Sequence, residues 1–215
     1  MGSLNDDDLD YLEQLHKHYE ETVRLLSDKK WCEKTLCGEF LSRIGMQFEE
    51  EEIIVVEPLK EPPDIEFRSA KFEIMYIVGE RKPDKEAKDR LKELIEAKTI
   101  DDTLSFILLP EKVTFDYLAG MISNSLNKKR KRYDPKIIPN LDALVYVRLN
   151  QFPDISSLLP SNLSQIISQG WRSVSTVISE YSLVLYANST APGFLKEIEG
   201  KQIPKTLLGW WYPKK

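Results

Sequence analysis

The chain has 215 residues, of which 41% are hydrophobic and 30% charged, a composition typical of a globular protein with one well-formed core. Its formal net charge of −5 argues against a histone-like protein that coats polyanions. No run approaches the roughly 18 apolar residues that a membrane span needs, and the N-terminus is acidic, unlike a signal peptide. We therefore expect a cytoplasmic protein with no membrane partner.

The charge is distributed unevenly along the chain. Residues 1–67 hold 18 acidic and 7 basic residues, a net charge of −11, whereas residues 68–215 have a net charge of +6. A surface that binds nucleic acid is therefore expected only from the later part of the chain.

The first 45 residues predict two helices. Apolar residues recur at steps of three and four through the first helix, and Ser27-Asp28 is typical of the N-cap of a second helix that ends at Gly45. Glu33 lies near the centre of the apolar face of the second helix, where a carboxylate needs a partner. Glu39 falls on the flank of that face, and we expect it to contact water.

After these helices, short segments rich in β-branched residues alternate with helical ones. The segments predicted as strands are residues 48–56, 64–67, 71–78, 105–109, 141–149, 173–178 and 182–187. The segments predicted as helices are residues 84–98, 114–132, 162–168 and 192–198. This alternation favours a single α/β domain with a mixed central sheet flanked by helices, in which residues 1–45 are helices packed on a core formed by residues 46–215.

Two of the predicted strands carry an acidic residue in an apolar segment. Asp64 follows a pair of prolines, and Glu73 lies within a run of apolar residues. A buried carboxylate is costly unless a cation meets it. Because side chains alternate along a strand, Lys71, Glu73 and Met75 share one face. If Asp64 lies beside Glu73, the two carboxylates and a backbone carbonyl could hold Mg²⁺ or Mn²⁺; the alternative is a structural ion pair between Glu73 and a basic residue.

A basic run lies at the end of the predicted helix 114–132. It consists of Lys128, Lys129, Arg130, Lys131 and Arg132. Cations suit the C-terminal end of a helix, so a solvated helix end is one interpretation. The other is contact with the phosphate backbone of nucleic acid, without recognition of its sequence.

The order Pro63-Asp64 and then Glu73 resembles the core of the restriction-endonuclease-like nucleases, whose signature is Pro-Asp, a variable gap and Asp/Glu-x-Lys. Glu33, followed by an apolar helical run and Gly45, resembles the third acid that these nucleases commonly carry on the helix before the three strands. The resemblance implies a restriction-endonuclease-like core with Asp64 and Glu73 as catalytic residues. It also implies an Mg²⁺ or Mn²⁺ site formed by Glu33, Asp64 and Glu73.

Met75 stands where these nucleases carry a lysine that polarises the scissile phosphate or helps to deprotonate water. Lys71, one step back on the same strand face, is a catalytic candidate to replace that lysine, and Lys82 and Lys88 are alternatives beyond the strand. If no lysine has migrated, the site is a relic, and Met75→Lys would create or raise activity.

The whole chain also resembles a small bacterial family of unknown function, number 1780, labelled "putative endonuclease". The segments that carry this resemblance are Trp31-Cys32-Glu33, Pro62-Pro63-Asp64-Ile65, Phe72-Glu73-Ile74 and Gln169-Gly170-Trp171-Arg172-Ser173. We predict a metal-dependent nuclease that hydrolyses phosphodiester bonds in DNA or RNA. The alternatives are an inactive relative that binds nucleic acid through the basic run, and an interaction module whose acidic N-terminal helices bind a protein partner.

Overall fold

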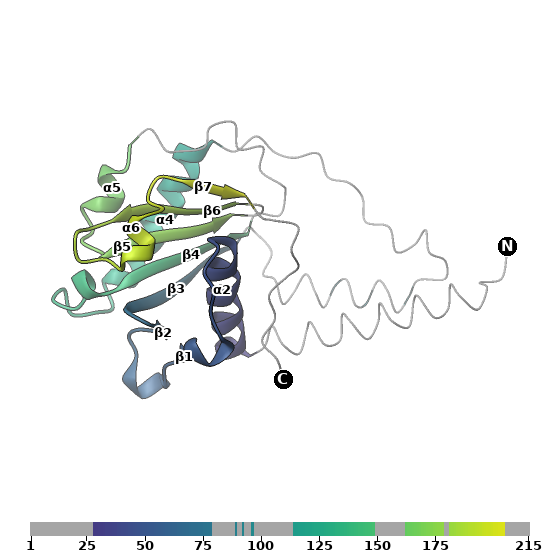
Figure 1. The fold of residues 1–215 in the computed structure, drawn as a ribbon. Helices are drawn as coiled ribbons and strands as arrows, with labels where there is room; N and C mark the ends of the chain where they lie inside the picture. Colours follow the sequence, from purple (N-terminus) through teal and green to yellow (C-terminus); the bar gives the residue numbers. More distant parts are fainter. Residues whose placement is uncertain are drawn as a thin grey trace, which may run out of the picture.

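The computed structural model describes residues 28–78, 114–148, 162–178 and 181–204, together with Asp89, Lys92 and Glu96. Within these residues the chain forms one seven-stranded sheet, and the strands follow one another across the sheet in chain order (Figure 1). The strands are β1 (Ile54–Val55), β2 (Ile65–Phe67), β3 (Ala70–Val78), β4 (Asp142–Arg148), β5 (Ser173–Ile178), β6 (Tyr181–Ala187) and β7 (Gln202–Pro204). The α-helices are α2 (Lys29–Arg43), α4 (Phe115–Arg130), α5 (Ser164–Ile167) and α6 (Gly193–Lys196), and the 3₁₀-helices are η1 (Glu50–Glu52), η2 (Pro58–Lys60) and η4 (Ile138–Asn140).

The sheet is mixed. Strands β3, β4 and β5 run parallel, and the pairs β1–β2, β2–β3, β5–β6 and β6–β7 are antiparallel. The connection from β3 to β4 contains α4, as a parallel pair requires a crossover. The predicted α/β fold with a mixed central sheet flanked by helices is confirmed.

Helices cover both faces of the sheet (Figure 1). Met75 and Ile77 of β3 pack in an apolar cluster with α4, whereas Phe72 and Ile74 pack in a second cluster with α2. Alternation along β3 explains this division, since successive side chains point to opposite faces. Glu73 shares the α4 face with Met75, so β3 carries an acid into a layer that is otherwise apolar.

Most of the predicted elements that fall on described residues are present. Helix α2 begins after Asp28, whose carboxylate accepts the Trp31 N–H, and ends before Gly45, whose φ of 79° only glycine adopts readily. Helix α4 begins after the N-cap Thr114 and ends at Arg130, so the basic run lies at its C-terminal end as predicted. The strands β2 to β6 and the short helices α5 and α6 lie within two residues of their predicted bounds.

The predicted strand 48–56 is largely wrong, because only Ile54–Val55 is a strand. The preceding glutamates form the 3₁₀-helix η1 instead. Its N-cap Glu49 and its N3 residue Glu52 form a capping box, in which the side chain of each residue accepts a hydrogen bond from the backbone of the other. This capping box satisfies backbone groups locally, so the segment needs no partner strand. The short edge strand β7 has too few residues to show an alternating pattern and was not predicted.

The expectation for Glu39 is also wrong. Its side chain is buried and pairs with the equally buried Arg43 one helical turn later. Because each charge of this ion pair has a partner within the helix, the flank of the apolar face can be buried without leaving an unpaired charge.

Several predictions lie outside the described residues. They are the first helix, most of helix 84–98, strand 105–109 and the candidates Lys82 and Lys88. Asp89, Lys92 and Glu96 are helical, as predicted. None of the helices in the described part of the chain has the length and apolar character needed to cross a membrane.

Candidate active site

Asp64 is held at the point where the chain enters β2. Its side chain is 1% exposed, and its Oδ2 accepts the Ile74 N–H of β3 at 2.8 Å. Its own backbone N–H donates to the Phe72 carbonyl at 3.0 Å, so both main chain and side chain are tied to β3. The carboxylate is therefore fixed against the strand that carries Glu73.

Glu73 lies inside β3 and is fully buried. Its Oε1 accepts the Tyr133 hydroxyl at 2.6 Å and contacts the ammonium of Lys129. Its Oε2 is buried and has no hydrogen-bond partner among the residues that the structure describes. A buried carboxylate oxygen without a donor is unusual, since nearly all buried polar atoms are paired.

Glu33 approaches from α2 on the other side of Asp64. Its side chain is 2% exposed and lies 3.1 Å from the ammonium of Lys29, one turn earlier. The same ammonium lies 3.4 Å from Asp64 Oδ1 and 3.6 Å from Glu61 Oε1. The predicted position of Glu33 on the buried face of the helix is confirmed.

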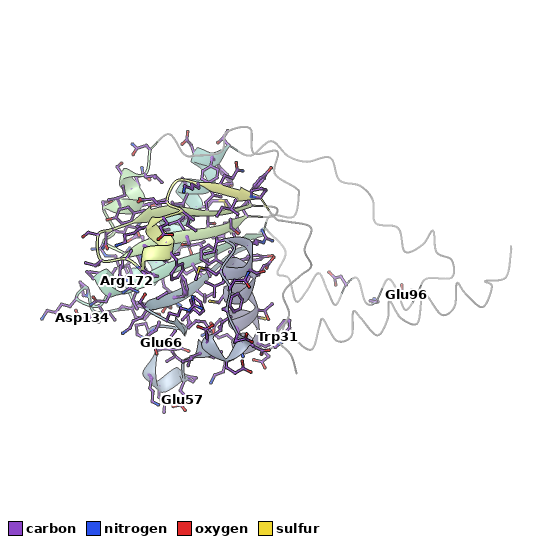
Figure 2. The ribbon with its side chains drawn as sticks, viewed as in Figure 1. Trp31, Glu57, Glu66, Glu96, Asp134 and Arg172 are labelled. Carbon is purple, nitrogen blue, oxygen red and sulfur yellow. The ribbon has the colours of Figure 1, made fainter. Side chains whose placement is uncertain are left out.

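Two lysines connect the three acids. Lys29 joins Glu33 to Asp64, and Lys129 joins Asp64 to Glu73, since its ammonium also lies 3.8 Å from Asp64 Oδ2. We call Glu33, Asp64 and Glu73 with these two lysines the acidic cluster. The structure thus brings together the three acids that the sequence singles out. Figure 2 labels Trp31 of α2 and Glu66 of β2, both in the lower part of the view.

Two acids of the cluster, Glu33 and Glu73, bind protons more tightly than free carboxylates. Burial raises the pKa of Glu73 to about 7, the charge of Asp64 adds to the rise, and Lys129 and Tyr133 oppose it. Burial and the Asp64 charge also raise the pKa of Glu33, against the effect of Lys29. Burial alone would lower the pKa of Lys29, but the hydrogen bond to Glu33 and the surrounding acids raise it. A further cation beside Asp64 and Glu73 would therefore be favourable.

The candidates on the face of β3 lie in different environments. Lys71 is exposed and has no ion pair with any residue that the structure describes; its backbone N–H donates to Asp142. Met75 lies on the same strand face as Glu73, as predicted, but it is 4% exposed and packed in the apolar cluster under α4. The position of the missing lysine is thus filled by core packing.

The side chains of the basic run point in two directions, toward solvent and toward the acidic cluster. Lys128, Lys131 and Arg132 are exposed, and Arg130 is half-buried. Lys129 turns inward, with 18% of its side chain exposed, and reaches the acidic cluster. Four members are therefore placed at the surface and one belongs to the candidate site.

A divalent cation fits two of the three acids. Among residues 28–78, 114–148, 162–178 and 181–204, no three His, Cys, Asp or Glu side chains are grouped closely enough to hold a metal ion. Asp64 and Glu73, however, already share one cation, the Lys129 ammonium, and Glu73 Oε2 lacks a partner. Carboxylate oxygens are the ligands that Mg²⁺ and Mn²⁺ prefer. The pair Asp64 and Glu73 fits such an ion better than the full set with Glu33.

Three residues of the site were missed or misassigned in the sequence. Lys29 precedes Glu33 by four residues, a spacing typical of a helical ion pair, and this signal was available. Lys129 carries a signal only as a member of the basic run, and Tyr133 carries none. Both reach Glu73 from α4 and the turn after it, 56 and 60 residues along the chain, so their contacts depend on the crossover connection.

Comparisons with known proteins identify a family and a solved structure of similar architecture. A family model described as "Putative endonuclease, protein of unknown function (DUF1780)" matches residues 7–206 and supports a nuclease-like function. A solved structure from Pseudomonas aeruginosa strain PAO1, a protein of unknown function described as belonging to the monooxygenase superfamily, is similar with a TM-score of 0.64. The two chains are 27% identical over 94% of this chain and 97% of the other. No curated protein matches the chain.

Proposed function

The chain belongs to the DUF1780 family, and from this premise we propose that it is a metal-dependent nuclease that hydrolyses phosphodiester bonds in DNA or RNA, with Asp64 and Glu73 as metal ligands. The observation that carries the proposal is the unpartnered Oε2 of Glu73 beside a second buried carboxylate. Leaving a buried acceptor unpaired costs about 1–3 kcal/mol. A cation bound between the two acids removes that cost.

The chain's own residues hold these ligands in place. The Ile74 N–H fixes one oxygen of Asp64, and the Tyr133 hydroxyl fixes one oxygen of Glu73. Glu33 adds negative charge from α2 and keeps Lys29 beside Asp64. When bound, Mg²⁺ or Mn²⁺ supplies Lewis acidity toward a phosphoryl oxygen and a more acidic water.

The exposed members of the basic run support nucleic acid as the substrate. Lys128, Lys131 and Arg132 lie at the end of α4 that also delivers Lys129 to the acidic cluster. Contacts from such side chains to backbone phosphates position a nucleic acid without reading its bases. A strand bound there would pass close to Asp64 and Glu73.

The two names found by comparison favour different chemistry. Monooxygenase-superfamily membership is stated of the Pseudomonas protein. In this chain, the oxygen ligands of Asp64 and Glu73 and the neighbouring basic run are typical of metal-assisted phosphodiester hydrolysis. We therefore propose hydrolysis. The second candidate, an inactive nucleic-acid-binding relative, is favoured by Met75 in the lysine position.

Calorimetric titration of Mn²⁺ together with a nicking assay tests the proposal. The wild type should bind Mn²⁺ and cleave nucleic acid, and Asp64→Asn should lose Mn²⁺ binding and at least about 100-fold of the cleavage rate. The matched control is Glu66→Gln, two residues away on β2 and outside the acidic cluster, which should behave as the wild type. Salt-dependent nucleic-acid binding without cleavage or Mn²⁺ binding in the wild type would instead establish the binding module.

A further inference from the structure

The polarising lysine expected on β3 has a replacement on α4. Resting on the proposed function, we infer that Lys129 is a catalytic residue, whose ammonium binds the scissile phosphate beside Asp64 and Glu73, and that Tyr133 positions Glu73 for it. Of the cations that the structure describes, only Lys129 contacts both of these acids.

The geometry of Lys129 suits this role. Its ammonium contacts Glu73 Oε1 and lies 3.8 Å from Asp64 Oδ2, so it is already at the place where a phosphate would approach the two acids. The side chain is 18% exposed, which leaves it open to a ligand from solvent. The ammonium also lies 5.9 Å from the centre of the Tyr133 ring, which limits the directions that it can take.

The other lysines near the site are less suitable. Lys29 contacts Asp64 from the α2 side, and its ammonium is shared with Glu33 and Glu61. Lys71 is exposed and makes no ion pair with the acids of the cluster. Helix α4 packs over the face of β3 that carries Glu73 and Met75, so a lysine from α4 reaches the space that a lysine at position 75 would otherwise serve.

The proposed step is ordinary hydrolysis. A water oxygen forms a bond to phosphorus, and the P–O bond to the leaving sugar oxygen breaks with its electron pair. The water loses a proton to solvent, and the leaving oxygen gains one from solvent. Lys129 stays protonated throughout and stabilises the charge that develops on the non-bridging phosphate oxygens. Tyr133 keeps its proton on the hydrogen bond to Glu73.

The test separates cleavage from metal binding. Lys129→Gln removes the charge but keeps a donor for Glu73, and it should lower the cleavage rate about 100- to 1000-fold. Its Mn²⁺ affinity should equal or exceed that of the wild type, because no ammonium competes for the two carboxylates. Lys129→Arg should restore at least a tenth of the rate and thereby keep the test valid if the glutamine variant folds poorly. The matched control is Lys136→Gln, an exposed lysine after α4 that lies outside both the basic run and the acidic cluster, and it should change the rate less than threefold.

The outcomes distinguish the two proposals. If Lys129→Gln cleaves as the wild type while Asp64→Asn does not, the role of Lys129 is overturned and the nuclease proposal stands. If Lys129→Gln loses Mn²⁺ binding together with cleavage, Lys129 is structural and the inference is again overturned. If the wild type neither binds Mn²⁺ nor cleaves, the nuclease proposal fails and the role of Lys129 fails with it.

Discussion

Two buried carboxylates on neighbouring strands of this sheet are satisfied to very different extents. Asp142, the first residue of β4, accepts hydrogen bonds from the Arg172 Nε at 3.0 Å, the Ser173 hydroxyl at 2.7 Å and the Lys71 N–H at 2.9 Å. A second nitrogen of Arg172 also contacts it. Figure 2 labels Arg172, which follows the Gln169-Gly170-Trp171 segment. We call Asp142, Arg172 and Ser173 the Asp142 cluster.

Glu73 is equally buried but incompletely paired. Within the described part of the chain it has one hydroxyl donor and one ammonium, both on Oε1, and no partner on Oε2. The comparison shows that burial of an acid does not by itself indicate function, since Asp142 is as buried as Glu73 and has donors on both oxygens. What distinguishes a candidate site is a buried acid that lacks a hydrogen-bond donor or a cation on one of its oxygens. We infer that the Asp142 cluster is structural, whereas the acidic cluster is the one that we propose to bind a cation.

The largest effect is expected at the structural acid. Asp142→Ala leaves the largely buried Arg172 guanidinium and the Ser173 hydroxyl without their acceptor, so we expect a loss of about 3–5 kcal/mol in the free energy of unfolding. Urea denaturation measures it. The control Asp134→Ala removes an exposed acid in the turn after α4, and should cost less than about 1 kcal/mol. Equal losses in the two variants would remove the basis for calling the Asp142 cluster structural.

Met75→Lys tests whether the acidic cluster is open on the α4 side of β3. Met75 is 4% exposed among apolar side chains, so a lysine there buries an ammonium, and we expect a loss of about 2–4 kcal/mol with no gain in Mn²⁺-dependent cleavage. This expectation from the structure replaces the gain of activity expected from sequence. The control Met75→Leu keeps the volume and should cost less than about 1.5 kcal/mol. A stable lysine variant with higher cleavage would show that position 75 reaches the cluster.

Glu73 and Met75 also show what the sequence could and could not predict. Acids within apolar segments predicted that Glu33 and Glu73 would be buried, and alternation along β3 placed Met75 on the face of Glu73. Both rest on local periodicity, which is read directly from a chain. Whether Met75 lines a cleft or a core depends on α4, which joins that face through the crossover connection, and no local pattern reports it.

The fold divides in the same way. The hairpins and both long helices follow from the periodicity of apolar residues, and the start of α2 also follows from its capping residue Asp28. The short edge strands do not, because the four glutamates before β1 form a capped 3₁₀-turn and β7 has only three residues. The Asp142 cluster was missed because Asp142 and Arg172 lie 30 residues apart and meet only where β4 and β5 pair.

Glu73→Gln is expected to change how stability depends on pH. Burial raises the pKa of Glu73 to about 7, so between the pKa of the unfolded chain, about 4.5, and 7 the folded protein holds more protons than the unfolded one. Stability of the metal-free protein therefore falls as pH rises through this window. The glutamine variant lacks that decline and should be about 1–3 kcal/mol more stable than the wild type at pH 8.

The control for this measurement is Glu66→Gln, an acid of β2 outside the acidic cluster, which should keep the wild-type pH profile. Thermal unfolding of the three proteins at pH 5, 6, 7 and 8, without added metal, gives the comparison. A Glu73→Gln variant less stable than the wild type at pH 8 would mean that the ion pair with Lys129 outweighs the burial of the carboxylate. Glu73 would then resemble Asp142, a structural acid.

The smallest effect is expected at Lys71, the residue that borders both clusters. Its backbone N–H donates to Asp142, and its place on β3 puts it on the face of Glu73, but its exposed side chain pairs with neither acid. Lys71→Ala keeps the backbone donor, so stability should change by less than about 0.5 kcal/mol. The cleavage rate should stay within about twofold of the wild type, in contrast to the large loss expected for Lys129→Gln.

Because the resemblance to restriction-endonuclease-like enzymes makes Lys71 the nearest replacement on the strand, this variant compares a role assigned from sequence with one assigned from contacts. Loss of cleavage with unchanged unfolding in Lys71→Ala would return the catalytic role to β3 and leave Lys129 as the structural partner of Glu73.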